Sequence, residues 1–361
     1  MSYELVKKVK ELEPYEPISG TYKIRLDANE SFFNFPDELR SEIKEAIDGF
    51  DFNRYPDSAA KELIKAFSDY YGIDPDNVTA TNGSDEVLYL IASAMLERGS
   101  RVVVTEPDFS MYAFYSFLSE NTILTYKKNE KLNIDIDDLI AFINDNKADM
   151  VIFSNPCNPT GCGISADDAR KLVREAGNCL VVLDEAYMDF WDQPLLKEAQ
   201  DHDNLIVLKT ASKAVGSASL RLGFAVANKT ITRALRAVKS PYNVNSLSQK
   251  IGKIVYDHKD LLKERTDEIK KQTRALYDGI KKLIESYQLP FVIYEPCANF
   301  VFIETEKAKD IYEFLLDNRI AVRLFGKYSA LRITAGSERE NTALLVNFEQ
   351  FIIQNILKRN R

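Results

Sequence analysis

The sequence predicts an α/β fold, in which a mostly parallel seven-stranded sheet contains one antiparallel strand and is followed by a smaller α+β C-terminal domain. Seven short apolar runs rich in β-branched residues alternate with helical stretches through the first two thirds of the chain. One connection between two of these runs is too short for a parallel crossover. Beyond residue 228 the pattern changes mainly to helices.

Two helices are expected before the first strand of the sheet. The first begins near Pro36 and places Leu39, Ile43 and Ile47 on one face, and the second covers about 58–71. Both therefore have an apolar side to bury against a sheet.

The strands of the sheet are expected where short apolar runs suit burial on both faces. These runs are 78–81, 101–105, 121–126, 149–153, 179–184, 205–209 and 221–226. Helical stretches such as 85–96, 110–118 and 166–176 separate most of them. Only residues 210–220 connect the last two runs, without an apolar helical face, so we expect one of these two strands to be antiparallel to its neighbours.

The C-terminal third reads as a smaller α+β domain attached by a long helix over 246–286, in which an interruption is allowed. Its expected strands are 291–294, 298–303, 320–324 and 330–334, and its expected helices are 307–318 and 337–358. The predicted organisation is an N-terminal arm over 1–28, a large α/β domain over 29–250 and a small domain over 251–361.

Composition excludes several classes of protein. Of 361 residues 45% are hydrophobic, and no apolar run reaches the ~18 residues of a membrane span. The net charge is −8 with acids and bases interleaved, which disfavours nucleic acid as a partner. Four cysteines without a Cys-x-x-Cys pair and two histidines disfavour a metal site. The opening segment is charged and lacks the apolar core of a secretory signal, so we expect a cytoplasmic protein.

An acidic pair ends the run 179–184. Ligands of open α/β sheets bind at the carboxyl ends of the strands, where Asp184 and Glu185 lie, followed by Tyr187. Asp184 is either a ligand-binding carboxylate or the cap of the following turn.

The loop over 210–221 combines hydroxyl groups, a lysine and an arginine between two strands. Hydroxyl groups with Arg221 suit a phosphate dianion, and Lys213, if it is held away from solvent beside a cation, can act as a nucleophile. A solvated surface role is the ordinary alternative for a lysine. The glycine spacing of a Walker loop is absent.

Two further loops follow predicted strands. The segment 82–86 has a glycine for a tight turn and then opens a helix, so it either binds a phosphate through Ser84 and the helix amides or only caps the helix. The segment 155–161 is a Pro-rich turn that would hold the Asn158 amide in the same crevice as Asp184. Together the four loops supply what pyridoxal 5′-phosphate needs: phosphate donors, a carboxylate for the pyridine nitrogen, an amide and a phenol for the ring oxygen, and a lysine.

The order of these motifs resembles the fold type I pyridoxal-phosphate-dependent aminotransferases, and within them the histidinol-phosphate aminotransferases, over nearly the whole chain. The superfamily motifs are Asn82–Glu86, Pro107–Tyr112, Asn158–Gly161, Asp184–Tyr187, Ser212–Lys213 and Arg221–Gly223. The motifs of the narrower family are Arg25–Glu30, Arg54–Asp57, Pro241–Asn245 and Leu331–Thr334. The fold, cofactor and reaction of this family are therefore expected here.

The resemblance also implies roles for single residues. Lys213 is expected as the Schiff-base lysine and proton shuttle, Asp184 on the pyridinium, Asn158 and Tyr187 on the ring oxygen, and Phe109 against the ring face. The cofactor phosphate is expected to contact the backbone amides of Ser84 and Asp85, the side chains of Thr210, Ser212 and Arg221, and Tyr55 from the other subunit of a homodimer. The substrate is expected to contact Arg332, with Arg323 as a second candidate for its phosphate and Asn29 nearby.

The chain also departs from the family pattern. Cys157 stands where a second Asn is usual, Val215 where Phe is common, 217–219 where Leu-Ala-Gly is common, and Asp108 where Thr or Ser is usual. The predicted reaction is the transamination of L-histidinol phosphate with glutamate and 2-oxoglutarate, for histidine biosynthesis. The alternatives are a lyase similar to threonine-phosphate decarboxylase, an aromatic amino-acid aminotransferase and a non-enzymatic cofactor-binding protein.

Overall fold

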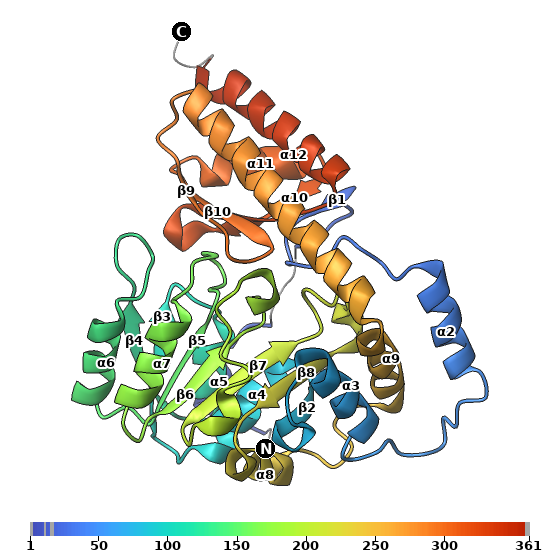
Figure 1. The fold of residues 1–361 in the computed structure, drawn as a ribbon. Helices are drawn as coiled ribbons and strands as arrows, with labels where there is room; N and C mark the ends of the chain where they lie inside the picture. The colour runs from blue at the N-terminus through green and yellow to red at the C-terminus, as the bar shows by residue number, and fades with distance from the viewer. Residues whose placement is uncertain (1–2, 11, 15–17, 358–361) are drawn as a thin grey trace.

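A seven-stranded sheet forms the main body of the computed structural model, which describes residues 3–10, 12–14 and 18–357. The strand order is β2-β8-β7-β6-β5-β3-β4, and helices cover both faces (Figure 1). The strands are β2 (Val78–Asn82), β3 (Arg101–Glu106), β4 (Thr122–Lys127), β5 (Met150–Ser154), β6 (Leu180–Asp184), β7 (Leu205–Thr210) and β8 (Leu222–Val226). All seven lie where apolar runs predict them.

Strand β8 is the antiparallel strand that the short connection predicts. It pairs antiparallel with β2 on one side and with β7 on the other, whereas β7, β6, β5, β3 and β4 pair in parallel. The chain thus turns back directly after β7, because the short connection from Thr210 to Leu222 holds no crossover helix. This topology brings the connecting loop to the carboxyl end of β7.

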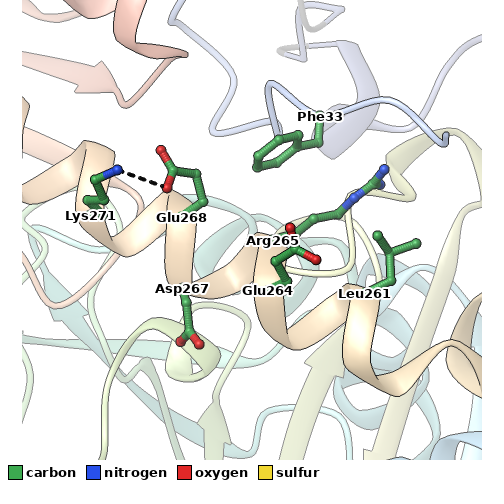
Figure 2. Close-up of a pocket in the computed structure, with 7 residues that line it drawn as sticks. All are labelled: Phe33, Leu261, Glu264, Arg265, Asp267, Glu268 and Lys271. Carbon is green, nitrogen blue, oxygen red and sulfur yellow. Dashed lines mark hydrogen bonds and ion pairs between the residues drawn. The ribbon is translucent and has the colours of Figure 1, made fainter.

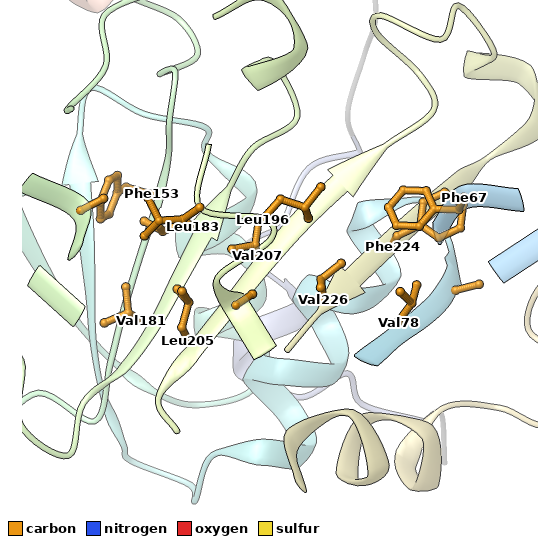
Figure 3. Close-up of a cluster of buried hydrophobic side chains, with 14 of the residues drawn as sticks. Phe67, Val78, Phe153, Val181, Leu183, Leu196, Leu205, Val207, Phe224 and Val226 are labelled. Atoms are coloured by element: carbon orange, nitrogen blue, oxygen red, sulfur yellow. The ribbon is translucent and has the colours of Figure 1, made fainter. Parts of the chain in front are cut away.

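Two hydrophobic clusters, one on each face of the sheet, hold the helices. The first includes Phe67, whose ring stacks on Phe224 at 3.9 Å between centroids, and it continues along β7 and β6 to Phe153 (Figure 3). The second includes Val87 and Ile206. The helices are α2 (Asp37–Ile47), α3 (Lys61–Tyr71), α4 (Ser84–Leu90), α5 (Met111–Leu118), α6 (Ile136–Asp145), α7 (Ala166–Glu175), α8 (Lys229–Val238) and α9 (Ser246–Asp257).

Helix α3 begins three residues later than the sequence pattern suggests. Ala60 has a left-handed backbone with φ 47°, and the Asp57 carboxylate accepts a hydrogen bond from the Lys61 amide at 2.9 Å. Residues 57–60 are therefore a turn that an Asp side chain stabilises.

Helix α4 ends at Leu90, before the end of the helical stretch expected over 85–96. The chain continues as a π-helical turn over Ile91–Met95.

The C-terminal part has a four-stranded antiparallel sheet of order β12-β13-β10-β9, called here the C-terminal sheet. Its strands are β9 (Val292–Tyr294), β10 (Phe300–Glu304), β12 (Arg323–Phe325) and β13 (Ala330–Thr334), and its helices are α10 (Lys259–Ser286), α11 (Ala308–Asp317) and α12 (Glu338–Phe351). The long helix predicted over 246–286 is divided at His258 into α9 and α10. Figure 1 shows α10 running from the main body up to this sheet.

The strand predicted over 320–324 is two short strands with different partners. Ile320 and Ala321 form β11, which pairs in parallel with β1 (Ile24–Arg25), whereas β12 pairs with β13. Leu26, directly after β1, belongs to the hydrophobic cluster beneath the C-terminal sheet. A segment from the start of the chain is thus part of the C-terminal core, and the boundaries predicted at residues 28 and 250 stay predictions. Within the part of the chain that the structure describes, no helix is both long and apolar enough to cross a membrane.

Candidate active site

Most of the predicted site residues lie at the carboxyl ends of β5, β6 and β7 or contact residues there. These strands are parallel neighbours with Ser154 opposite Asp184 and Asp184 opposite Leu208, so the loops that follow them leave from one edge. Because all three strands are buried along their length, polar side chains are found mainly where the strands end.

Asp184 is a buried carboxylate with neutral partners. Its side chain accepts hydrogen bonds from the Tyr112 hydroxyl at 2.8 Å and from the Ala186 amide at 3.0 Å, so it does cap the following turn. Burial raises the pKa of Asp184 to about 6, although these two hydrogen bonds act in the opposite direction. A cation placed against this carboxylate would be stabilised by a charge-assisted hydrogen bond.

Lys213 lies beside Tyr187. Its Nζ donates to the Ala28 carbonyl at 3.0 Å and is 5.7 Å from the centre of the Tyr187 ring. The Tyr187 hydroxyl accepts a hydrogen bond from Asn29 Nδ2 at 2.9 Å, and the Asn29 amide donates to Thr334 Oγ1. The lysine, the phenol and the N-terminal segment thus form one contact set.

A close backbone approach builds a cradle beside Arg221. A Cβ on Gly223 would be 2.4 Å from the carbonyl carbon of Gly83, and a Cβ on Gly83 would be 2.7 Å from Arg221 Nη2. Any side chain at either glycine would therefore displace backbone or the guanidinium. Arg221 has φ 51°, a left-handed backbone, and its Nη2 is 3.4 Å from Asp85.

Hydrogen-bond donors surround this cradle. The Thr210 hydroxyl accepts from the Ser212 amide at 3.1 Å and donates to the Ser212 hydroxyl at 3.0 Å. The first amides of α4, at Ser84 and Asp85, have no acceptors within their own helix. Hydroxyl groups, free amides and a guanidinium are the donors that a phosphate dianion requires.

Arg332 joins the C-terminal sheet to this edge. It is 7% exposed, donates from Nη2 to the Asp27 carbonyl at 2.6 Å and from Nη1 to Asn158 Oδ1, and lies over the rings of Phe300 and Phe325. Arg332 is therefore buried and does not lie on an edge strand, because β13 is between β12 and β10.

Arg323 is the neighbour of Arg332 across two paired strands. The two residues are directly opposite in the β12–β13 register, so they share one face of the C-terminal sheet. Arg323 is partly exposed. Two arginines from neighbouring strands thus lie on the same face of this sheet.

Phe109 and Tyr55 have different surroundings. The Phe109 ring lies edge to face with Tyr112 at 5.5 Å, and Tyr112 bonds Asp184. Tyr55 stands apart on the surface: its residue is 81% exposed and its ring stacks on Tyr242 at 4.5 Å. Of the predicted residues in the described chain, Tyr55 is thus not placed with the others.

Sequence reasoning assigned no role to Tyr112, the hydrogen-bond partner of Asp184. The segment that holds it, Pro107–Tyr112, is visible in the sequence, and its spacing places Tyr112 one helical turn after Phe109. The direction of its hydroxyl depends on how α5 packs on the sheet, which no local pattern contains.

A separate groove of about 610 Å³ lies along α10 rather than at the strand ends. Figure 2 shows Phe33 above the helix and charged side chains of both signs along it. Its lining is Phe33, Leu261, Glu264, Arg265, Asp267, Glu268 and Lys271. Such mixed, largely exposed charges do not converge on one ligand group as the residues at the strand ends do.

Comparison with known proteins gives concordant matches. The family model "Aminotransferase class I and II" matches residues 21–348. A histidinol-phosphate aminotransferase of Clostridium novyi is 40% identical over 96% of both chains. Among solved structures, a histidinol-phosphate aminotransferase of Sinorhizobium meliloti in complex with pyridoxal 5′-phosphate has a TM-score of 0.85 at 21% identity over 97% of both chains. The L-threonine-O-3-phosphate decarboxylase of Porphyromonas gingivalis has a TM-score of 0.77 at 22% identity, with 92% of this chain and 100% of that chain covered.

The buried Asp184 carboxyl predicts a pH-dependent effect of Asp184→Asn on the stability of the cofactor-free protein. Because the folded-state pKa of about 6 exceeds the unfolded value, the folded state binds the extra proton. Proton binding to Asp184 thus stabilises the folded wild type at low pH, and the free energy of unfolding falls as pH rises from about 4 through the folded-state pKa of about 6. Asn does not titrate, so relative to wild type the variant should gain about 2 kcal/mol between pH 4 and 6, a few tenths of a kcal/mol more up to about pH 7, and nothing further above that. Urea unfolding at several pH values measures this, and a constant difference would contradict the assignment.

Proposed function

The chain belongs to the aminotransferase class I and II family, and from this premise we propose that it transfers the amino group of L-histidinol phosphate to 2-oxoglutarate with pyridoxal 5′-phosphate as cofactor, a step of histidine biosynthesis. The observation that carries the proposal is the juxtaposition at one sheet edge of buried Asp184, Lys213 and the Gly83–Gly223 cradle. The similarity to histidinol-phosphate aminotransferases over 96% of the chain supports the substrate.

The residues at this edge fit the cofactor. Asp184 is a buried carboxylate, and both of its hydrogen-bond partners are neutral. Its carboxylate would hold the protonated ring nitrogen. Tyr187 and Asn158 would bond the ring oxygen, and Phe109 would contact the ring face. The phosphate would be held by Ser84, Asp85, Thr210, Ser212 and Arg221. When bound, pyridoxal 5′-phosphate supplies an aldehyde that takes up the amino group and a ring that accepts the electron pair left by the broken Cα–H bond.

Lys213 is the residue that moves protons in this proposal. Its Nζ is held by the Ala28 carbonyl beside Tyr187, and replacing that one hydrogen bond would free the amine for the reacting centre. It would take the proton from Cα and return it at the cofactor carbon, acting first as general base and then as general acid. Asp184 would keep the ring nitrogen protonated while this happens.

Arg332 would bind the anion of either substrate. Glutamate has an α-carboxylate next to the reacting carbon, and histidinol phosphate has a phosphate ester there instead. The planar guanidinium can bond either anion in a forked geometry, and the Phe300 and Phe325 rings limit its movement. Arg323, on the same face, would add a second positive charge for the phosphate.

We also propose that the protein is a homodimer with composite sites. Tyr55 is far more exposed than a stacked aromatic residue usually is, and Phe52 beside it is 72% exposed. If a partner subunit covers this patch, Tyr55 can reach the cofactor phosphate bound in that partner.

We propose a cytoplasmic location for the protein. The cysteines of the described chain are unpaired, which suits the reducing cytoplasm.

The direct test of the function is an assay of both products. With histidinol phosphate and 2-oxoglutarate, the loaded enzyme should form glutamate and the keto phosphate without release of carbon dioxide. Carbon dioxide from threonine phosphate would favour the decarboxylase, and a preference for aromatic amino acids would favour an aromatic amino-acid aminotransferase.

The role of Lys213 is tested by borohydride reduction followed by peptide mapping. The pyridoxyl group should remain on Lys213, and Lys213→Ala should abolish both label and turnover. A label on another lysine would contradict the role of Lys213.

The shared anion contact is tested with Arg332→Lys. Lysine keeps the charge but loses the fork, so kcat/KM should fall for glutamate and for histidinol phosphate together, by about 10-fold to 100-fold each. Single-turnover measurements of the two half-reactions give the two values. A loss confined to glutamate would assign the phosphate contact to another residue, and no loss in either would remove Arg332 from the site.

The composite site is tested with Tyr55→Phe. Removing a hydroxyl that bonds the cofactor phosphate across the dimer should weaken cofactor binding, by about tenfold. Equilibrium dialysis measures the affinity, and sedimentation measures the oligomeric state of wild type and variant. Tyr242→Phe, which changes the stacked neighbour in the same way, is the matched control. A fully active monomer would contradict the cross-subunit role.

A further inference from the structure

Two residues that depart from the family pattern, Asp108 and Cys157, meet at one buried lysine. Lys128 Nζ is 3.5 Å from Asp108 Oδ2 and donates to Cys157 Sγ at 2.9 Å. The side chains of Lys128 and Asp108 are each 2% exposed. A lysine and a carboxylate with so little exposure persist only where hydrogen bonds satisfy both groups.

The Asp108 carboxylate fixes the backbone of two loops. Its Oδ1 accepts from the Phe109 amide at 2.8 Å and from the Ser154 hydroxyl, and its Oδ2 accepts from Thr105 Oγ1 at 2.6 Å. The Ser154 hydroxyl in turn accepts from the Asn158 amide at 2.9 Å. One carboxylate therefore bonds Phe109 directly and Asn158 through a single serine.

Lys128 ties the same two loops together from the other side. It follows β4 directly and donates to the Pro107 carbonyl at 2.8 Å, one residue before Asp108, while its contact with Cys157 lies one residue before Asn158. Burial lowers the pKa of Lys128, but the neighbouring Cys157 and Asp108 outweigh it, and the pKa is raised. The lysine thus stays charged and balances the carboxylate.

We propose that Lys128 and Asp108 are a positioning pair that holds Phe109 and Asn158 in the geometry required at the cofactor ring. This inference rests on the proposed function, since it assigns the pair a purpose only if the ring lies between those two residues. Neither residue of the pair touches the proposed reacting atoms. The pair acts through one backbone amide, one serine and the loop carbonyl at Pro107.

The pair also gives a reason for the departure at position 108. Thr or Ser at position 108 could accept the Phe109 amide with a neutral oxygen and would need no buried cation. Asp at that position introduces a charge, and Lys128 neutralises it with Cys157 as a further acceptor. Asp108→Thr should consequently make Lys128 dispensable.

The test compares wild type, Lys128→Met, Asp108→Thr and the double variant. Cofactor Kd is measured by titration, and dichroism and kinetics are measured at saturating pyridoxal 5′-phosphate. Lys128→Met leaves a buried carboxylate unbalanced, so we expect cofactor Kd to rise about tenfold and the circular dichroism in the cofactor absorption band to change at saturation. We expect kcat to fall more than KM rises, since misplaced ring contacts affect the reacting geometry. In the double variant cofactor Kd, kcat and KM should lie within about threefold of their values in Asp108→Thr, and the dichroism should match that of Asp108→Thr.

Arg170→Met is the control for loss of an ion pair away from the strand ends. Arg170 lies on α7 and pairs with Glu198 at 2.8 Å, and both side chains are partly buried. Its loss should lower the unfolding midpoint and leave the cofactor dichroism unchanged. Unchanged dichroism in Lys128→Met, or no rescue in the double variant, would overturn the positioning role. If Lys128→Met does not fold, Asp108→Thr is compared with the double variant. A cofactor Kd that is tenfold higher in the double variant would contradict the positioning role of the pair. Absence of cofactor binding by wild type would overturn the proposed function instead.

Discussion

A buried guanidinium, that of Arg332, joins the three parts of the chain on which the candidate site depends. It comes from the C-terminal sheet, bonds the Asp27 carbonyl of the N-terminal segment, and bonds Asn158 in the loop after β5. A buried charge requires such partners, so the relative placement of these parts is constrained by hydrogen bonding as well as by apolar packing. The same contacts aim the guanidinium at the carboxyl edge of the main sheet.

The main sheet is a rigid frame whose buried strands are not accessible to ligands. Its central strands are buried along their length, so the reactive groups occupy the loops that leave their carboxyl ends. Two networks of buried polar groups then fix those loops. Asp184 with Tyr112 forms one, and Asp108 with Lys128 forms the other. A chain with a net charge of −8 thus still places Lys213, Arg221 and Arg332 at the edge where anions are expected to bind.

Sequence patterns predicted the strands and the antiparallel position of β8, because apolar runs of strand length and a connection too short for a crossover are local features. They also indicated Asp184, the last residue of β6, and Lys213, three residues after β7. The pairing of β1 with β11 was not predicted, since two residues carry no periodicity. The partners of Lys128 were equally hidden, because a lysine after a strand normally lies in solvent and its burial depends on two distant loops. Asp108 was recognised as a departure without a reason, and the reason is a contact across neighbouring strands.

The pairing of β1 with β11 has a consequence for how the protein is made. Ile24 leaves the ribosome nearly 300 residues before its partner Ile320. At about 5–20 residues per second, the N-terminal segment waits roughly 15 to 60 s for the strand that buries it. During this interval Ile24 and Leu26 are exposed apolar residues that chaperones can bind. The Asp27 carbonyl can meet Arg332 only when the chain has grown by about 300 further residues, so a nascent chain can complete its main sheet well before Arg332 reaches the candidate site.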